Sequence, residues 1–222
     1  MNYKSKKIIS AICALVFYAG FAIFTYFVKN FDLQEIAPDG SLVGFASLNL
    51  ACKAQFGASE LWYEITEILG WFAIFICLVF AGIGLYQFIK GRGIAKVDKD
   101  IICMGILYLI CIIAYIVFAK ITINVRPVFE SDGSLESSYP SSHTILAICV
   151  FASLLIEIAR RIKDPAKALL EEISCMGIIF ITVTGRFLSG AHWASDIIGG
   201  IIISIAFIFT FLAILPEPPK AE

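Results

Sequence analysis

Charged side chains are scarce in this sequence. Only 16% of its 222 residues are Asp, Glu, Lys or Arg, whereas soluble domains average roughly 25%. Hydrophobic residues make up 59% of the chain, and its mean hydropathy is +0.89. A chain this apolar would expose large adhesive patches if it folded in water. The composition therefore excludes an ordinary soluble domain and predicts an integral membrane protein.

The sequence also lacks a strong net charge and any paired-cysteine motif. Its 17 basic and 18 acidic residues leave a formal charge of -1, so no overall field favours nucleic acid, and we expect no nucleic-acid partner. The 7 cysteines include no CxxC pair, and all but Cys52 lie in strongly apolar stretches. This distribution argues against both a disulfide framework and a cysteine metal site.

Long hydrophobic runs are abundant instead. A helix needs about 20 apolar residues to cross the hydrocarbon core of a bilayer. Four runs meet this length easily and two are shorter, the second of which reaches about 27 Å only if its helix begins near Ala168. We expect an all-α integral membrane protein with six transmembrane helices, forming a single domain over residues 1–222. The expected spans are residues 8–28, 68–88, 101–119, 144–159, 173–185 and 197–215.

The lysines and arginines predict how these spans are oriented. Twelve of the 17, including Lys220, lie near the termini or in the second and fourth loops, and five lie in the other loops. Because positive residues favour the cytoplasmic side, we expect a multi-pass protein of the cell membrane with both termini in the cytoplasm. The acidic first loop, residues 29–67, is then external, and its apolar residues predict pieces that lie along the membrane interface.

Both histidines and three isolated cations fall at the expected external ends of the spans. His143 lies at the start of the fourth span and His192 just before the sixth. The cations are Lys120, Arg126 and Arg186, and arginine makes bidentate contacts to phosphate oxygens. A phosphate ester or anhydride is the ligand that this set of residues favours.

The spacing of two further groups adds to this chemistry. His192 and Asp196 are four residues apart, which predicts that they lie on one helical face. The carboxylate can then accept the proton of one ring nitrogen and leave the other as a free lone pair, as a histidine nucleophile requires. Ser141 and Ser142 open the fourth span, where unpaired N–H groups and hydroxyls form an anion site.

These residues form three motifs that follow one another along the chain. They are Lys120-x5-Arg126-Pro127, Pro140-Ser141-Ser142-His143 and Gly185-Arg186-x5-His192-x3-Asp196. The trio resembles the signature motifs of the type-2 phosphatidic acid phosphatase superfamily, the membrane lipid phosphate phosphatases. The chain departs from that pattern in having one residue fewer between the lysine and Arg-Pro, a serine at 142 in place of glycine, and a glycine at 185 in place of serine.

The resemblance implies a membrane phosphatase that acts through a phosphohistidine and needs neither metal nor cofactor. His192 would be the nucleophile, Asp196 would orient it, and His143 would protonate the leaving oxygen. The substrate would be a lipid phosphate in the bilayer, such as phosphatidic acid, phosphatidylglycerol phosphate or a polyprenyl diphosphate. The resemblance implies phosphate contacts from Lys120, Arg126, Ser141, Ser142 and Arg186.

Two other functions are compatible with parts of the pattern. A lipid-linked phosphotransferase would use the same phosphohistidine but pass the phosphoryl group to an acceptor other than water. An ion- or proton-coupled transporter would use Arg186, His192 and Asp196 as a path through the membrane. The transporter is disfavoured because the interiors of the last four spans contain almost no polar residues to continue such a path.

The charge distribution yields a test of topology. Single cysteines placed at positions 94 and 133 in a cysteine-free background should react differently with an impermeant thiol reagent on intact cells. We expect labelling at 133, in the third loop, and none at 94, in the second loop, because the second loop carries four of the basic residues. Labelling at 94 but not at 133 would reverse the topology.

Overall fold

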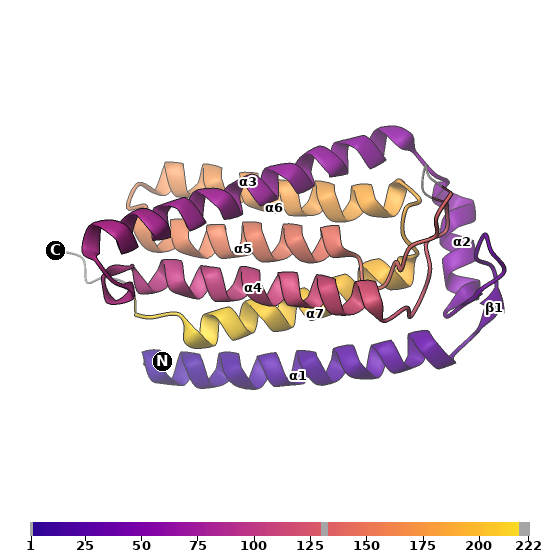
Figure 1. The fold of residues 1–222 in the computed structure, drawn as a ribbon, viewed down its shortest axis with the longest axis horizontal. Coiled ribbons are helices and arrows are strands. Elements are labelled where there is room, and N and C mark those ends of the chain that lie inside the picture. The colour runs from indigo at the N-terminus through magenta and orange to yellow at the C-terminus, as the bar shows by residue number, and fades with distance from the viewer. Residues whose placement is uncertain (1, 130–132, 218–222) are drawn as a thin grey trace.

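In the part that the structure describes, the protein is mostly helical and contains six helices long and apolar enough to cross a membrane (Figure 1). The computed structural model describes residues 2–129 and 133–217, so Lys220 lies outside the described part. The prediction of an all-α protein with six spans is confirmed, and the described residues also form two short strands. The spans are α1 (Tyr3–Asn30), α3 (Glu60–Gly91), α4 (Lys99–Lys120), α5 (Ser142–Arg161), α6 (Pro165–Leu188) and α7 (Ala194–Ile214).

Successive spans run in opposite directions, so α1 begins and α7 ends at the same end of the bundle (Figure 1). We call this the terminal end. The opposite end carries the segment between α1 and α3, and we call it the α2 end. That segment contains the antiparallel strands β1 (Gln34–Glu35) and β2 (Leu42–Val43) and the short helix α2 (Ala46–Phe56), while the 3-10 turn η1 (Ile94–Lys96) joins α3 to α4.

All six spans are bounded somewhat differently from the prediction, and two of them start eight residues early. The fifth span was expected over residues 173–185, but α6 has 24 residues and is therefore about 36 Å long. It begins early because the Asp164 side chain accepts a hydrogen bond from the Ala166 N–H and Pro165 occupies the first turn. Similarly, α3 begins at Glu60, so the first connection is shorter than residues 29–67. Acidic residues in its first two turns concealed this start.

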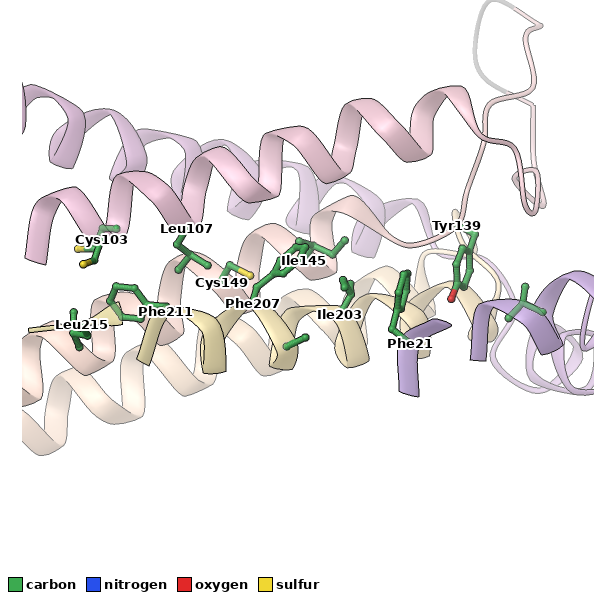
Figure 2. Close-up of a cluster of buried hydrophobic side chains, with 13 residues drawn as sticks. Phe21, Cys103, Leu107, Tyr139, Ile145, Cys149, Ile203, Phe207, Phe211 and Leu215 are labelled. Atoms are coloured by element: carbon green, nitrogen blue, oxygen red, sulfur yellow. The ribbon is translucent and has the colours of Figure 1, made fainter. Parts of the chain in front are cut away.

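α5 and α7 form the buried centre of the bundle. In each of these two helices, 44% of the residues in the most apolar 18-residue stretch are buried, against 11–17% in the other spans. Side chains from α4, α5 and α7 meet in one apolar cluster that includes Leu107, Cys149 and Phe207 (Figure 2). The outer spans instead expose most of their large hydrophobic side chains, as a surface in contact with lipid does. The helices that begin at the histidine motifs are therefore the two most enclosed ones.

Tyr139 fastens the segment before α5 to α1, through Phe21 and Thr25, and lies against α7 at Gly199. Its ring lies 5.9 Å from that of Phe21, and its hydroxyl shares a hydrogen bond of 2.8 Å with Thr25. A Cβ at Gly199 would lie 2.5 Å from Cε2 of this ring. The missing side chain at position 199 thus lets the segment that precedes His143 lie directly on α7.

Gly199→Ala should therefore destabilise the fold. The added methyl group would overlap the buried Tyr139 ring, and overpacking of this kind costs about 1–3 kcal/mol. A lowered thermal unfolding midpoint in detergent would report the loss. Gly105→Ala is the matched control, because nothing lies within 4 Å of a Cβ built there. Equal unfolding midpoints for the two variants would contradict this account of Tyr139.

Candidate active site

His192 lies in the turn between α6 and α7, not within the helix as its spacing to Asp196 predicted. Its Nδ1 is 3.1 Å from the carbonyl oxygen of Ser138 and 3.7 Å from Oδ2 of Asp196. Only the carbonyl is at hydrogen-bond distance. Asp196 Oδ2 instead accepts a hydrogen bond of 3.0 Å from the backbone N–H of Trp193 and so caps α7. Asp196 thus lies close to the His192 ring, but the backbone carbonyl of Ser138 orients the ring.

This arrangement decides which nitrogen of His192 carries the lone pair. A carbonyl oxygen can only accept, so Nδ1 carries the proton, and Nε2 of the neutral ring is unprotonated. Nε2 is buried and has no hydrogen-bond partner within the described parts of the chain. Burial lowers the pKa of His192 from 6.5 to about 4, because the low-dielectric surroundings disfavour the charged ring. His192 is therefore neutral at physiological pH, with an available lone pair.

A network of buried side chains holds Asp196 in place. Its Oδ1 accepts a hydrogen bond of 3.1 Å from Asn124, which also contacts Ser195 Oγ at 3.3 Å. Asn49 of α2 donates to the same Ser195 hydroxyl at 3.0 Å. The sequence analysis did not single out Asn124 or Asn49. The sequence marks Asn124 as the one side-chain amide between Lys120 and Arg126, whereas Asn49 is one of several amides in the first loop.

His143, Arg186 and Glu67 converge from three different spans. Arg186, in the last turn of α6, places Nη2 at 2.6 Å from Nδ1 and 2.9 Å from Nε2 of His143. The same Nη2 lies 2.6 Å from Oε1 of Glu67, and this oxygen is 3.3 Å from Nε2 of His143. The guanidinium is fully buried and lies over the ring of Tyr63 at 5.1 Å.

The sequence had assigned Glu67 only to the acidic external loop. In the structure it belongs to one face of α3 formed by Tyr63, Thr66, Glu67 and Gly70, which have helical spacing. A Cβ at Gly70 would lie 2.9 Å from the His143 ring, and one at Gly185 would lie 2.6 Å from Thr66. The glycine at 185, where the resembled family has serine, therefore allows α3 to pack closely against α6.

Arg126 is fixed by a short antiparallel pairing of two loop segments. Its backbone N–H donates to the Glu136 carbonyl at 3.0 Å, and its Nη2 lies 3.2 Å from Glu136 Oε2. Next to it, the Ser138 N–H donates to the Asn124 carbonyl at 2.9 Å. The pairing thus presents Arg126 together with the carbonyl that orients His192.

Three of the predicted phosphate contacts do not line the cavity described below. Arg186 is one of them, because its guanidinium is fully buried against His143 and Glu67. Lys120 ends α4 as an exposed residue and does not line the cavity described below, in keeping with its shifted spacing. Ser141 is fully buried, and its hydroxyl caps α5 by accepting from the Thr144 N–H at 3.4 Å. Ser142, in contrast, lines the cavity at the first turn of α5.

A cavity of about 620 Å³ connects the two histidines. His143, His192, Arg126 and Ser142 line it toward the α2 end. The rest of its wall comes from α3, α4, α5 and the loop between α4 and α5, which adds polar residues such as Glu136 and Ser137, while the helices supply mostly apolar ones. The main contributors are Ile74, Cys77, Tyr108, Cys111, Ile112, Ala114, Tyr115, Phe118, Ala119, Ile145 and Leu146. A polar pocket with histidine and arginine therefore opens onto an apolar chamber.

This arrangement agrees with comparisons to known proteins. A family model described as the PAP2 superfamily matches residues 103–219, which include all three motifs. The chain belongs to the PAP2 superfamily. The resemblance drawn from the motifs is thus confirmed, and with it the expectation of a multi-pass membrane protein.

A solved structure has a similar fold. It is described as the crystal structure of the first transmembrane PAP2 type phosphatidylglycerolphosphate phosphatase from Bacillus subtilis. The alignment has a TM-score of 0.56 and 15% sequence identity, and covers 90% of this chain and 94% of the other. At this identity the likeness shows a shared fold. A search of curated proteins found no match.

The environment of His192 predicts an unusual titration. Between pH 6.5 and 4 an exposed imidazole becomes protonated, whereas His192 stays neutral. The unfolded state therefore binds more protons in this window, and His192 makes folding less favourable as pH falls through it. NMR of ¹³C-histidine-labelled protein should show one resonance, absent in His192→Asn, that shifts with a midpoint near pH 4. A midpoint near 6.5 would contradict the buried, neutral state.

Proposed function

We propose that this PAP2 protein is a membrane phosphatase that hydrolyses a phosphate monoester or diphosphate of a lipid. The observation that carries the proposal is that the same cavity is lined by the two histidines and Arg126 and, over the rest of its length, by many apolar side chains. The lining residues of α4 extend from Tyr108 to Ala119, about 17 Å along the helix axis. A phosphate headgroup fits the polar part, and an acyl or prenyl chain fits the apolar part.

In the proposed first step, the His192 Nε2 lone pair attacks phosphorus. A P–N bond forms while the bond from phosphorus to the leaving oxygen breaks, and that oxygen takes its proton from His143. The Ser138 carbonyl oxygen, which accepts the Nδ1–H of His192, stabilises the positive charge that develops on the ring. In the second step, water attacks the phosphohistidine in line and loses a proton to His143. A P–O bond forms while the P–N bond breaks, which returns the lone pair to His192 Nε2 and releases inorganic phosphate.

Positive charge and backbone dipoles would stabilise the transferring phosphoryl group. Arg126 and Arg186 supply guanidinium groups, and the first turn of α5 at Ser142 supplies N–H groups at the positive end of a helix dipole. These groups fulfil the role that a metal ion has in other phosphatases, so we propose a metal-independent reaction. Lys120 and Ser141 have no part in this mechanism.

The proposed substrates are phosphatidic acid, phosphatidylglycerol phosphate and polyprenyl diphosphates. The printed description of the similar fold from Bacillus subtilis, a phosphatidylglycerolphosphate phosphatase, makes the second a suitable first trial. We further propose that the terminal end is cytoplasmic and that the cavity opens toward the external face, because basic residues are concentrated near the termini and in the loops at that end.

A phosphate-release assay on purified protein in detergent tests this function. We expect hydrolysis of at least one of the three lipids, persistence of that activity in EDTA, and inhibition by vanadate, which imitates the five-coordinate phosphoryl group. His192→Ala should abolish turnover and leave no acid-labile phosphoenzyme after brief mixing with ³²P-labelled substrate.

Two arginine variants serve as a matched pair. Arg126→Ala should lower kcat by about 10²-fold, the usual effect of removing one group that stabilises developing charge. Arg92→Ala, an exposed residue after α3 at the terminal end, should leave kcat unchanged. Loss of turnover in EDTA with recovery in Mg²⁺, or a phosphoenzyme that still forms in His192→Ala, would overturn the proposed mechanism.

A further inference from the structure

Glu67 contacts both His143 and Arg186, although neither the three motifs nor the proposed reaction assigns it a role. A single oxygen, Oε1, lies 2.6 Å from Arg186 Nη2 and 3.3 Å from His143 Nε2. The side chain is about one-third exposed, whereas Arg186 is fully buried. Thr66, the preceding residue of α3, accepts from Arg186 Nη1 at 3.3 Å. One turn of α3 therefore supplies two contacts to the arginine and one to the histidine.

The contact between Arg186 and His143 creates a charge conflict. The guanidinium nitrogen lies within 3 Å of both ring nitrogens, so a protonated His143 would face a second positive charge at contact distance. Yet His143 must carry an additional proton if it is to donate one to the leaving oxygen. A negative group within reach of both cations resolves the conflict, and Glu67 Oε1 occupies that position.

We propose that Glu67 is a positioning residue that holds His143 as the general acid. This inference rests on the proposed phosphatase function and deepens it. Glu67 accepts the N–H of one ring nitrogen, which fixes the ring and offsets its charge, and the other ring nitrogen donates to the leaving oxygen. The proton that this oxygen gains comes from His143, and Glu67 keeps its charge throughout. When substrate binds, its phosphate takes the place of His143 as a partner of the Arg186 guanidinium.

The dependence of rate on the leaving group tests this role. An alkyl leaving oxygen needs a proton from the acid, whereas nitrophenolate leaves as a stable anion. Glu67→Gln should therefore lower kcat on dioctanoyl phosphatidic acid by about 10- to 100-fold, and kcat on p-nitrophenyl phosphate by less than about threefold. KM should not rise for either substrate, because the variant removes a negative charge from beside the phosphate.

A double variant links this effect to His143. If Glu67 acts through the histidine, Glu67→Gln combined with His143→Asn should be no slower on phosphatidic acid than His143→Asn alone. Glu64→Gln is the matched control, because it lies on the same helix but is exposed. It should leave both activities unchanged.

Glu67→Asp keeps the negative charge but shortens the side chain by one methylene group, which moves the carboxylate away from His143. It provides a second test in case the glutamine variant does not fold. The ratio of phosphatidic acid turnover to p-nitrophenyl phosphate turnover in Glu67→Asp should therefore lie between the ratio of the wild type and the lower ratio of Glu67→Gln. Equal losses on both substrates in either folded variant, or additive losses with His143→Asn, would overturn the role of Glu67 while leaving the phosphatase function intact. A wild-type protein that hydrolyses none of the three proposed lipids and no p-nitrophenyl phosphate would overturn both.

Discussion

Two hydrogen bonds, one between backbone groups and one from the His192 side chain to a backbone carbonyl, join the segment before α5 to α7 and the turn before it, and the site depends on them. The Ser141 N–H donates to the Asp196 carbonyl at 3.1 Å, and the Ser138 carbonyl accepts from His192 Nδ1 at 3.1 Å. The first bond brings the start of α5, and hence His143, beside the start of α7. The second selects the tautomer of His192. Side-chain chemistry at this site thus follows from a main-chain contact between two helix starts.

Burial explains why so many polar side chains surround that contact. A polar group without a partner is costly away from water, and Asp196 and Ser195 are both fully buried. Asn124 and Asn49 supply their hydrogen bonds, and the second comes from α2. The connection between α1 and α3 is therefore part of the support of the site as well as a link between two spans.

α3 contributes to the site in a different way. Its Glu67 face approaches the histidine and arginine motifs because small residues stand at the points of contact, Gly70 against His143 and Gly185 against Thr66. Farther along α3, Ile74 and Cys77 line the cavity together with residues of α4. One helix thus provides an acidic group beside the proposed phosphate site and a wall for the proposed lipid chain.

Local sequence was sufficient to predict the six spans, because hydropathy is a property of consecutive residues. Motif order along these spans then placed five side chains at one end of the bundle, namely His143, His192, Asp196, Arg126 and Arg186. The tertiary structure alone decided their partners. Ser138 rather than Asp196 orients His192, Ser141 caps a helix, and Lys120 stays outside the cavity. Glu67 joined the site because α3 packs against α5 and α6. Contacts between distant spans depend on helix rotation and close packing, which the spacing within one motif does not determine.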